Sequence, residues 1–136
     1  MRYLIDTNVL ANYVTEGYIS NDVEAIISNC ENQIYVSSEC LKEFIHLVQA
    51  GKIVLKKELR SLDVFDLVEN VLGFNVKFVT KEHLRTLAKL ETVEGHSDPS
   101  DRLIIAQAIT ENIPLISSDT KFPKYIQFGL DFIPNR

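Results

Sequence analysis

Four carboxylates are the residues in this sequence whose type and placement could do chemistry: Asp6, Glu43, Asp101 and Asp119. Each stands where a predicted strand or helix would direct it toward one edge of a sheet. Like charges that converge in this way cannot all stay ionised unless cations neutralise them. Ligands that are all oxygen favour hard ions, so the expected cofactor is Mg²⁺ or Mn²⁺ rather than zinc. Such a pocket suits phosphodiester hydrolysis, in which bound metal ions help to ionise the attacking water and stabilise the leaving oxygen.

Asp6 and Asp119 each follow a short apolar run. Residues 3–5 and 114–116 are typical of strands buried on both faces, and each acid comes at or soon after the carboxyl end of its strand. In open α/β sheets, ligands bind at that edge. If the two strands are neighbours, the two acids face each other there.

Glu43 and Asp101 are expected on helices. Glu43 lies on the edge of an apolar helical stripe, whereas Glu39 is turned further toward solvent. Asp98 and Pro99 have the character of the cap and first residue of a helix, which places Asp101 in the middle of its apolar face. A charge that points inward there is unfavourable unless it is paired or bound to a metal ion.

The rest of the chain alternates between predicted strands and helices. Further strands are expected at about 33–36, 76–79 and 131–133, helices at about 7–15, 20–30, 38–50, 57–72, 80–88 and 98–109, and a turn or 3₁₀ piece at 122–129. This alternation implies a parallel sheet with right-handed crossovers and helices on both faces. The expected fold class is therefore α/β, a three-layer α/β/α arrangement in a single domain over 1–136, with about five strands in the order 3-2-1-4-5.

The composition is typical of a globular domain without a membrane span. Of 136 residues, 46% are hydrophobic and 24% charged, and no apolar run approaches the roughly 18 residues that a transmembrane helix needs. The first strand starts too early to leave room for a signal peptide, so we expect a cytoplasmic protein. Cys30 and Cys40 lack a metal-like spacing and are expected to be reduced, half-buried thiols.

The net charge of −5 argues against a general nucleic-acid coat, which would be basic. It allows an enzyme that acts on nucleic acid and gathers its acids in a metal pocket, because two divalent cations would bring the formal charge from −5 to about −1. Lys42, Arg102 and Lys121 are next to the acids in sequence and are the first candidates for contacting RNA phosphates.

Four segments carry a family resemblance: LIDTN at 4–8, SSECLKE at 37–43, HSDPSDRLIIAQA at 96–108 and LISSD at 115–119. In this order and spacing they resemble the motifs of the PIN-domain ribonucleases, and most closely those of the VapC-type toxins of bacterial toxin–antitoxin pairs. The resemblance covers nearly the whole chain. One departure is Ser100, where relatives often have a bulky apolar residue.

The resemblance implies a Mg²⁺-dependent endoribonuclease whose metal site is formed by the four carboxylates. Asn8 and Ser117 would be supporting polar groups. It also implies a homodimer that is silenced by a small antitoxin protein whose tail covers the acidic groove. The motifs do not identify the target RNA, because recognition of RNA depends on the protein's loops and on the shape of the RNA.

Each acid also has a simpler structural interpretation. Asp6 could cap the following helix, although either of the next two residues could do so instead, and Asp119 could begin a turn. Glu43 could be an ordinary boundary residue, and Asp101 a first-turn acid stabilised by the helix dipole. Of the other polar residues near the expected site, Asp98 is interpreted as a helix cap, with an outer metal contact as the alternative, and His46 and His96 are interpreted as structural.

Two other functions fit the whole chain less well. A non-catalytic PIN module could bind RNA or a protein partner, but such a module has no reason to bear the repulsion of four acids. A phosphoacceptor receiver domain would need its acceptor aspartate after the third strand, where this chain reads FVTK at 78–81. The sequence has no glycine-rich phosphate-binding loop that would indicate a nucleotide-binding enzyme.

Overall fold

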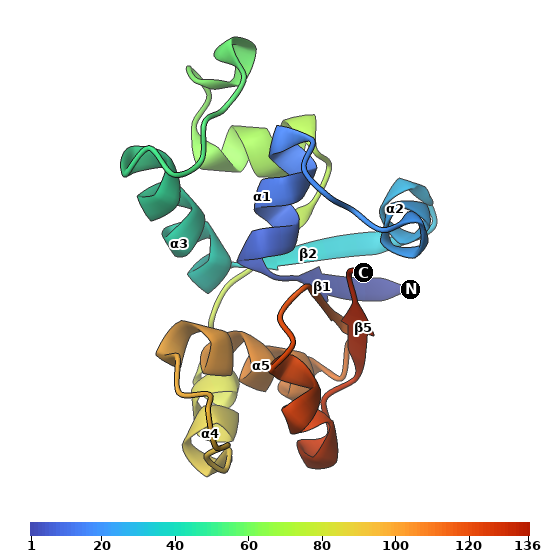
Figure 1. Ribbon diagram of the computed structural model, residues 1–136, viewed down its shortest axis with the longest axis vertical. Coiled ribbons are helices and arrows are strands. Elements are labelled where there is room, and N and C mark those ends of the chain that lie inside the picture. Colours follow the sequence, from blue (N-terminus) through green and yellow to red (C-terminus); the bar gives the residue numbers. More distant parts are fainter.

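A computed structural model describes residues 1–136 as a five-stranded parallel sheet with helices on both faces. The elements in chain order are β1 Arg2–Ile5, α1 Thr7–Thr15, α2 Asn21–Ser28, β2 Gln33–Ser37, α3 Ser38–Gln49, η1 Lys57–Leu59, η2 Asp66–Val71, β3 Asn75–Lys77, α4 Lys81–Lys89, α5 Pro99–Glu111, β4 Leu115–Ser117, η3 Phe122–Phe128 and β5 Phe132–Pro134. The sheet order is β3-β2-β1-β4-β5, which confirms the predicted 3-2-1-4-5. Helices α1, α2 and α3 cover one face, and α4 and α5 the other (Figure 1).

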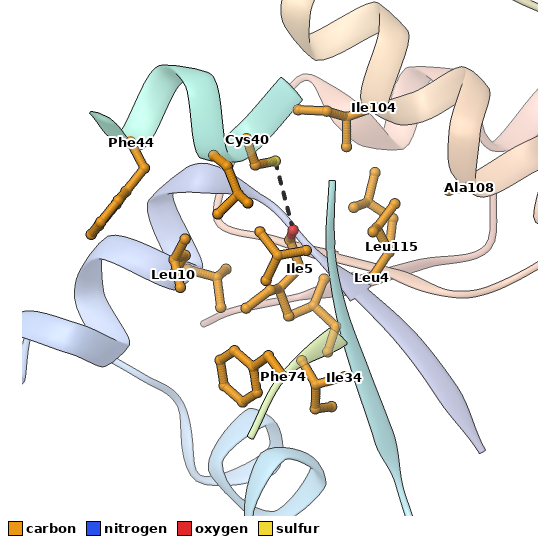
Figure 2. Packing of buried hydrophobic residues seen from close by; sticks show 14 of the residues in the cluster. Leu4, Ile5, Leu10, Ile34, Cys40, Phe44, Phe74, Ile104, Ala108 and Leu115 are labelled. Carbon is orange, nitrogen blue, oxygen red and sulfur yellow. Dashed lines mark hydrogen bonds between the residues drawn. The ribbon is translucent and has the colours of Figure 1, made fainter. Parts of the chain in front are cut away.

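Strand β1 lies at the centre of both the sheet and the core. It pairs in parallel with β2 on one side and with β4 on the other. Leu4 and Ile5 are fully buried. Figure 2 shows helix side chains such as Leu10 and Ile104 packing around this strand. Burial on both faces explains why β1 is an apolar run rather than an alternating one.

Capping side chains set the starts of the main helices, largely as predicted. Ser20, Thr80 and Asp98 cap α2, α4 and α5 by accepting hydrogen bonds from backbone N–H groups. Ser37 caps α3 in the same way. The cap of α1 is Asp6 itself, not one of the two residues that follow it.

The single helix predicted over 57–72 is wrong. The structure has two short pieces there, η1 and η2. The carboxylate of Asp63 accepts hydrogen bonds from the N–H groups of Phe65 and Asp66, at 2.7 and 3.0 Å. This local cap competes with a continuous helix and starts the second piece.

Smaller corrections concern individual positions. Strand β3 begins and ends earlier than predicted, whereas β4 and β5 are each shifted one residue later. The helix predicted over 80–88 is α4, which buries His83 fully and leaves Leu84 half exposed. Cys30 is exposed and Cys40 is buried, so neither thiol is half-buried.

Cys40 packs against the central strand, where its thiol lies 3.8 Å from the carbonyl oxygen of Ile5 (Figure 2). Burial raises the pKa of the Cys40 thiol far above its ordinary value.

None of the helices has the length and apolarity needed to cross a membrane.

Candidate metal centre

Asp6 lies where the two central strands end, and it is almost fully buried. Its N–H donates to the carbonyl oxygen of Ile116 in β4, at 3.2 Å. Its Oδ1 accepts a hydrogen bond from the N–H of Val9 at 2.9 Å, which caps α1. Its Oδ2 accepts a hydrogen bond from the hydroxyl of Ser117. The backbone of β1 and β4 therefore fixes the position of this carboxylate, and two donors fix its orientation.

Burial raises the pKa of Asp6 to about 7. The hydrogen bonds from Ser117 and Val9 act in the opposite direction, and repulsion from Asp101 and Asp119 adds to the rise. A buried carboxylate beside two other acids lacks a counter-charge among the protein groups around it. A divalent cation would supply that charge and restore the ionised form.

Asp101 lies in the first turn of α5, partly buried and facing the sheet edge. Its Oδ2 lies 3.2 Å from Nε2 of His96. The pKa of Asp101 is raised, first by burial and then by repulsion from Asp98 and Asp119, while the His96 hydrogen bond acts to lower it. A first-turn acid stabilised only by the helix dipole would show the opposite shift.

Glu43 reaches the site from α3. Its Oε2 accepts a hydrogen bond from the hydroxyl of Thr7 at 3.3 Å. This contact links the middle of α3 to the first residue of α1. The pKa of Glu43 is raised, first by burial and then by repulsion from Asp101. Glu43 also lines a polar hollow of about 370 Å³ whose other residues are Lys42, His46, Asp98 and Ser100.

Asp119 follows β4 and has both a turn role and a place in the acidic group. Its N–H donates to the Ser117 hydroxyl at 3.0 Å, and its Oδ1 accepts from the N–H of Lys121 at 2.8 Å. One ligand atom each of Asp119, Asp101 and His96 lies within 4.8 Å of the others, close enough to surround one ion.

The structure therefore brings the four predicted acids into one electrostatic group. Asp101 raises the pKa of both Asp6 and Glu43, and Asp119 raises the pKa of both Asp6 and Asp101. Asn8 is exposed and makes no side-chain hydrogen bond, so its supporting role stays a prediction. Carboxylate oxygens dominate the donor set, which fits a hard divalent cation.

Two details differ from the sequence-based interpretation. Glu39 is not turned to solvent: its carboxylate accepts a hydrogen bond from Ser100 and pairs with Lys42, both at 2.8 Å, because the first turns of α3 and α5 meet. Ser100, the departure from the family pattern, makes this contact. Arg102 is not free to meet RNA, since it donates to the carbonyl oxygens of Leu90 and Glu91.

His96 is the residue of the site that the sequence interpretation missed. It is almost fully buried, and its imidazole contacts the Asp101 carboxylate directly. The sequence-based interpretation gave it a structural role only. Its five-residue separation from Asp101 was the available signal. That signal is weak, because the irregular segment between α4 and α5 determines where the imidazole lies.

Comparison with known proteins agrees with this description. Residues 3–126 match the family model described as PIN domain. Among solved structures, VapBC2 from Rickettsia felis bound to a promoter DNA fragment has a TM-score of 0.74 at 23% identity, covering 98% of both chains. DNA-bound VapBC from Salmonella typhimurium has a TM-score of 0.69 at 16% identity, covering 100% of this chain and 99% of the other.

A third similar structure is VapBC-5 from Mycobacterium tuberculosis, described as a member of a toxin–antitoxin family. Its TM-score is 0.60 at 20% identity, covering 99% of this chain and 98% of the other. At these identities the likeness shows a shared fold. No curated protein matches the sequence significantly.

Proposed function

The chain belongs to the PIN domain family, and we propose that it is a metal-dependent endoribonuclease, the toxin of a toxin–antitoxin pair. The observation that carries the proposal is the burial and mutual repulsion of the acids. Asp6, Glu43 and Asp101 all have raised pKa values, and each is raised partly by another acid. A binding module gains nothing from this repulsion, whereas a site for divalent cations requires the charge.

In the proposed site the cation is Mg²⁺ or Mn²⁺, held by Asp6, Glu43, Asp101 and Asp119. Bound there, it would help to ionise water and stabilise the leaving oxygen of a phosphodiester. The protein groups orient these ligands. Ser117 holds Oδ2 of Asp6, and its hydroxyl also accepts from the N–H of Asp119, so one serine couples the ends of β1 and β4.

RNA is the proposed substrate, and the polar hollow beside Glu43 is the proposed route for its backbone. Lys42 and His46 lie one helical turn apart on α3 at this hollow. Lys42 is exposed, and its pairing with Glu39 is a surface contact that a phosphate could replace. In a chain with a net charge of −5, such local cations matter for contacting phosphates.

Purified protein and a labelled single-stranded RNA test the nuclease. We expect cleavage with Mg²⁺ or Mn²⁺, loss of cleavage in excess chelator and recovery when metal is restored. Asp6→Asn, folded and inactive, is the matched control against contaminating nuclease. RNA binding without cleavage at any metal concentration would favour the non-catalytic module instead.

We further propose a small antitoxin partner, since a similar structure is described as a member of a family of toxin–antitoxin systems, and a homodimer, which the family resemblance implies. Expression of the chain in bacteria should arrest growth, and co-expression of its antitoxin, sought in the adjacent reading frame, should relieve the arrest. Asp6→Asn should not arrest growth but should still co-purify with the antitoxin. Light scattering of the purified chain tests the dimer.

A further inference from the structure

A buried hydrogen-bond chain leads to Asp101 from outside the group of four acids. Nε2 of His96 lies 3.2 Å from Oδ2 of Asp101, and Nδ1 of His96 lies 2.7 Å from the hydroxyl of Tyr125. The same hydroxyl accepts a hydrogen bond from Arg102 at 3.3 Å. Tyr125 is fully buried and His96 almost so, which shields these contacts from competing water.

The direction of this chain follows from the carboxylate at its end. An ionised carboxylate can only accept a hydrogen bond, so the ring proton of a neutral His96 is on Nε2, where it is donated to Asp101. Nδ1 of His96 then accepts from the Tyr125 hydroxyl, whose oxygen also accepts from Arg102.

The surrounding contacts hold every member of this chain in place. Arg102 also donates to the carbonyl oxygens of Leu90 and Glu91, at 2.9 and 3.0 Å. The rings of Phe122 and Tyr125 lie edge-on to the His96 imidazole, with centroids 5.9 and 5.3 Å away. The imidazole therefore has little freedom to rotate away from Asp101.

We propose that His96 is a positioning residue for the metal site: its contact with Oδ2 fixes the orientation in which the Asp101 carboxylate would bind a divalent cation. This inference rests on the proposed function. Because its Nε2 carries a proton, His96 is not itself a ligand, although its distances to Asp101 and Asp119 would allow one. Partners that orient a ligand in this way typically change metal affinity by about 10- to 100-fold.

Mn²⁺ binding, measured by electron paramagnetic resonance of the free ion, tests this role without depending on activity. His96→Ala should weaken Mn²⁺ binding by about tenfold or more. His96→Gln, which retains an N–H donor at similar reach, should recover much of the affinity. Tyr125→Phe keeps the imidazole in place but frees it to adopt either tautomer. It should therefore weaken Mn²⁺ binding, but less than His96→Ala does.

The double variant His96→Ala, Tyr125→Phe distinguishes a chain from two separate effects. If Tyr125 acts only through His96, the double variant binds Mn²⁺ no more weakly than His96→Ala alone. Circular dichroism and urea unfolding of each variant establish that the affinities belong to folded protein. A purely structural role would lower stability while leaving the Kd of the folded protein unchanged, and would overturn the proposal.

The other outcomes are also decisive. Equal Mn²⁺ affinity of wild type and His96→Ala would overturn the positioning role and leave the nuclease proposal standing. If His96→Gln is as weak as His96→Ala and both alter the visible spectrum of bound Co²⁺, His96 is a ligand and the inference is wrong. Absence of Mn²⁺ binding in wild type would overturn the proposed function and this inference together.

Discussion

Ser117 donates a hydrogen bond to Asp6 across the boundary between β4 and β1, the two strands whose ends form the acidic site. The other carboxylate oxygen of Asp6 caps α1 through the N–H of Val9. One side chain thus starts a helix, joins two strands and is proposed to bind metal. Variants at this position must separate the structural contributions from the chemical one.

Asp6→Asn should abolish RNA cleavage and leave the metal-free protein as stable as wild type or more stable. The amide oxygen can still cap α1, while a buried charge is removed. Asp6→Ala also removes the charge but loses the cap, and should be less stable than Asp6→Asn by about 1 kcal/mol. Urea unfolding and cleavage assays measure both; near-normal cleavage by a folded Asp6→Asn would exclude Asp6 from the metal site.

The stability of the metal-free protein should fall as the pH rises toward neutrality. The pKa of Asp6 is about 7 in the folded protein against an ordinary 3.8, so the folded state holds this proton more tightly than the unfolded state. Its contribution is complete below the ordinary value and is lost as the pH rises through about 7. Urea unfolding without metal from about pH 5 to about pH 8 tests this.

Asp6→Asn is the control for this pH dependence, because its side chain does not titrate. Its profile should be flatter than that of wild type across the same range. Saturating Mg²⁺ should restore wild-type stability at the high end of the range. Profiles of the same slope for the two proteins would contradict the assignment to Asp6.

Asp101→Asn should not destabilise the metal-free protein, and it should reduce the stabilisation gained from Mg²⁺. Without metal, the substitution removes the repulsion between Asp101 and the neighbouring acids. With metal, the Kd for Mg²⁺ is higher, so the stabilisation by bound Mg²⁺, RT ln(1 + [L]/Kd), is smaller. Asp22, an exposed first-turn acid of α2, offers a matched control. Asp22→Asn should lose a few tenths of a kcal/mol to about 1 kcal/mol at every Mg²⁺ concentration.

Melting curves against Mg²⁺ separate the two interpretations of Asp101. If Asp101→Asn behaves like Asp22→Asn, with a parallel titration that lies below wild type throughout, then Asp101 is only a helix-dipole residue. The site would then have three acids.

Glu111→Gln should weaken the fold without altering cleavage. Glu111 accepts from His83 at 2.9 Å and from Lys77 at 3.0 Å, and these contacts lower its pKa, His83 first. The loss at neutral pH should be about 1 kcal/mol. Because the pKa of Glu111 is lowered in the folded protein, its contribution to stability is complete at pH values above its ordinary pKa of 4.5. That contribution is lost as the pH falls through the folded-state pKa, so the difference in stability from wild type should shrink in acid. A changed cleavage rate would instead link this cluster to the site.

Local sequence patterns were enough to predict the strand order and most helix starts. The buried run at β1 and the caps Ser20, Thr80 and Asp98 are signals carried by a few adjacent residues. The break in the predicted 57–72 helix was also local, but Asp63 was not recognised as a cap. Competition between a capping side chain and helix continuation is hard to judge from apolar spacing alone.

The missed parts of the site depend on contacts between distant elements. His96 reaches Asp101 because Arg102 holds the segment at Leu90 and Glu91, and because Tyr125, 29 residues further along, orients the imidazole. The contact between Glu39 and Ser100 likewise requires α3 to meet α5. No periodicity within one helix encodes such meetings, which follow only from the packed fold.

The contrast between the two cysteines gives this chain a single natural attachment point for a probe. Cys40 is buried and its raised pKa keeps it a thiol, so it should not react with maleimides while the protein is folded. Cys30 is exposed just after α2, before the start of β2 and thus at the edge of the sheet opposite to the acids. A nitroxide or fluorophore on Cys30 would therefore report on association with RNA or a partner without any change to the acidic site.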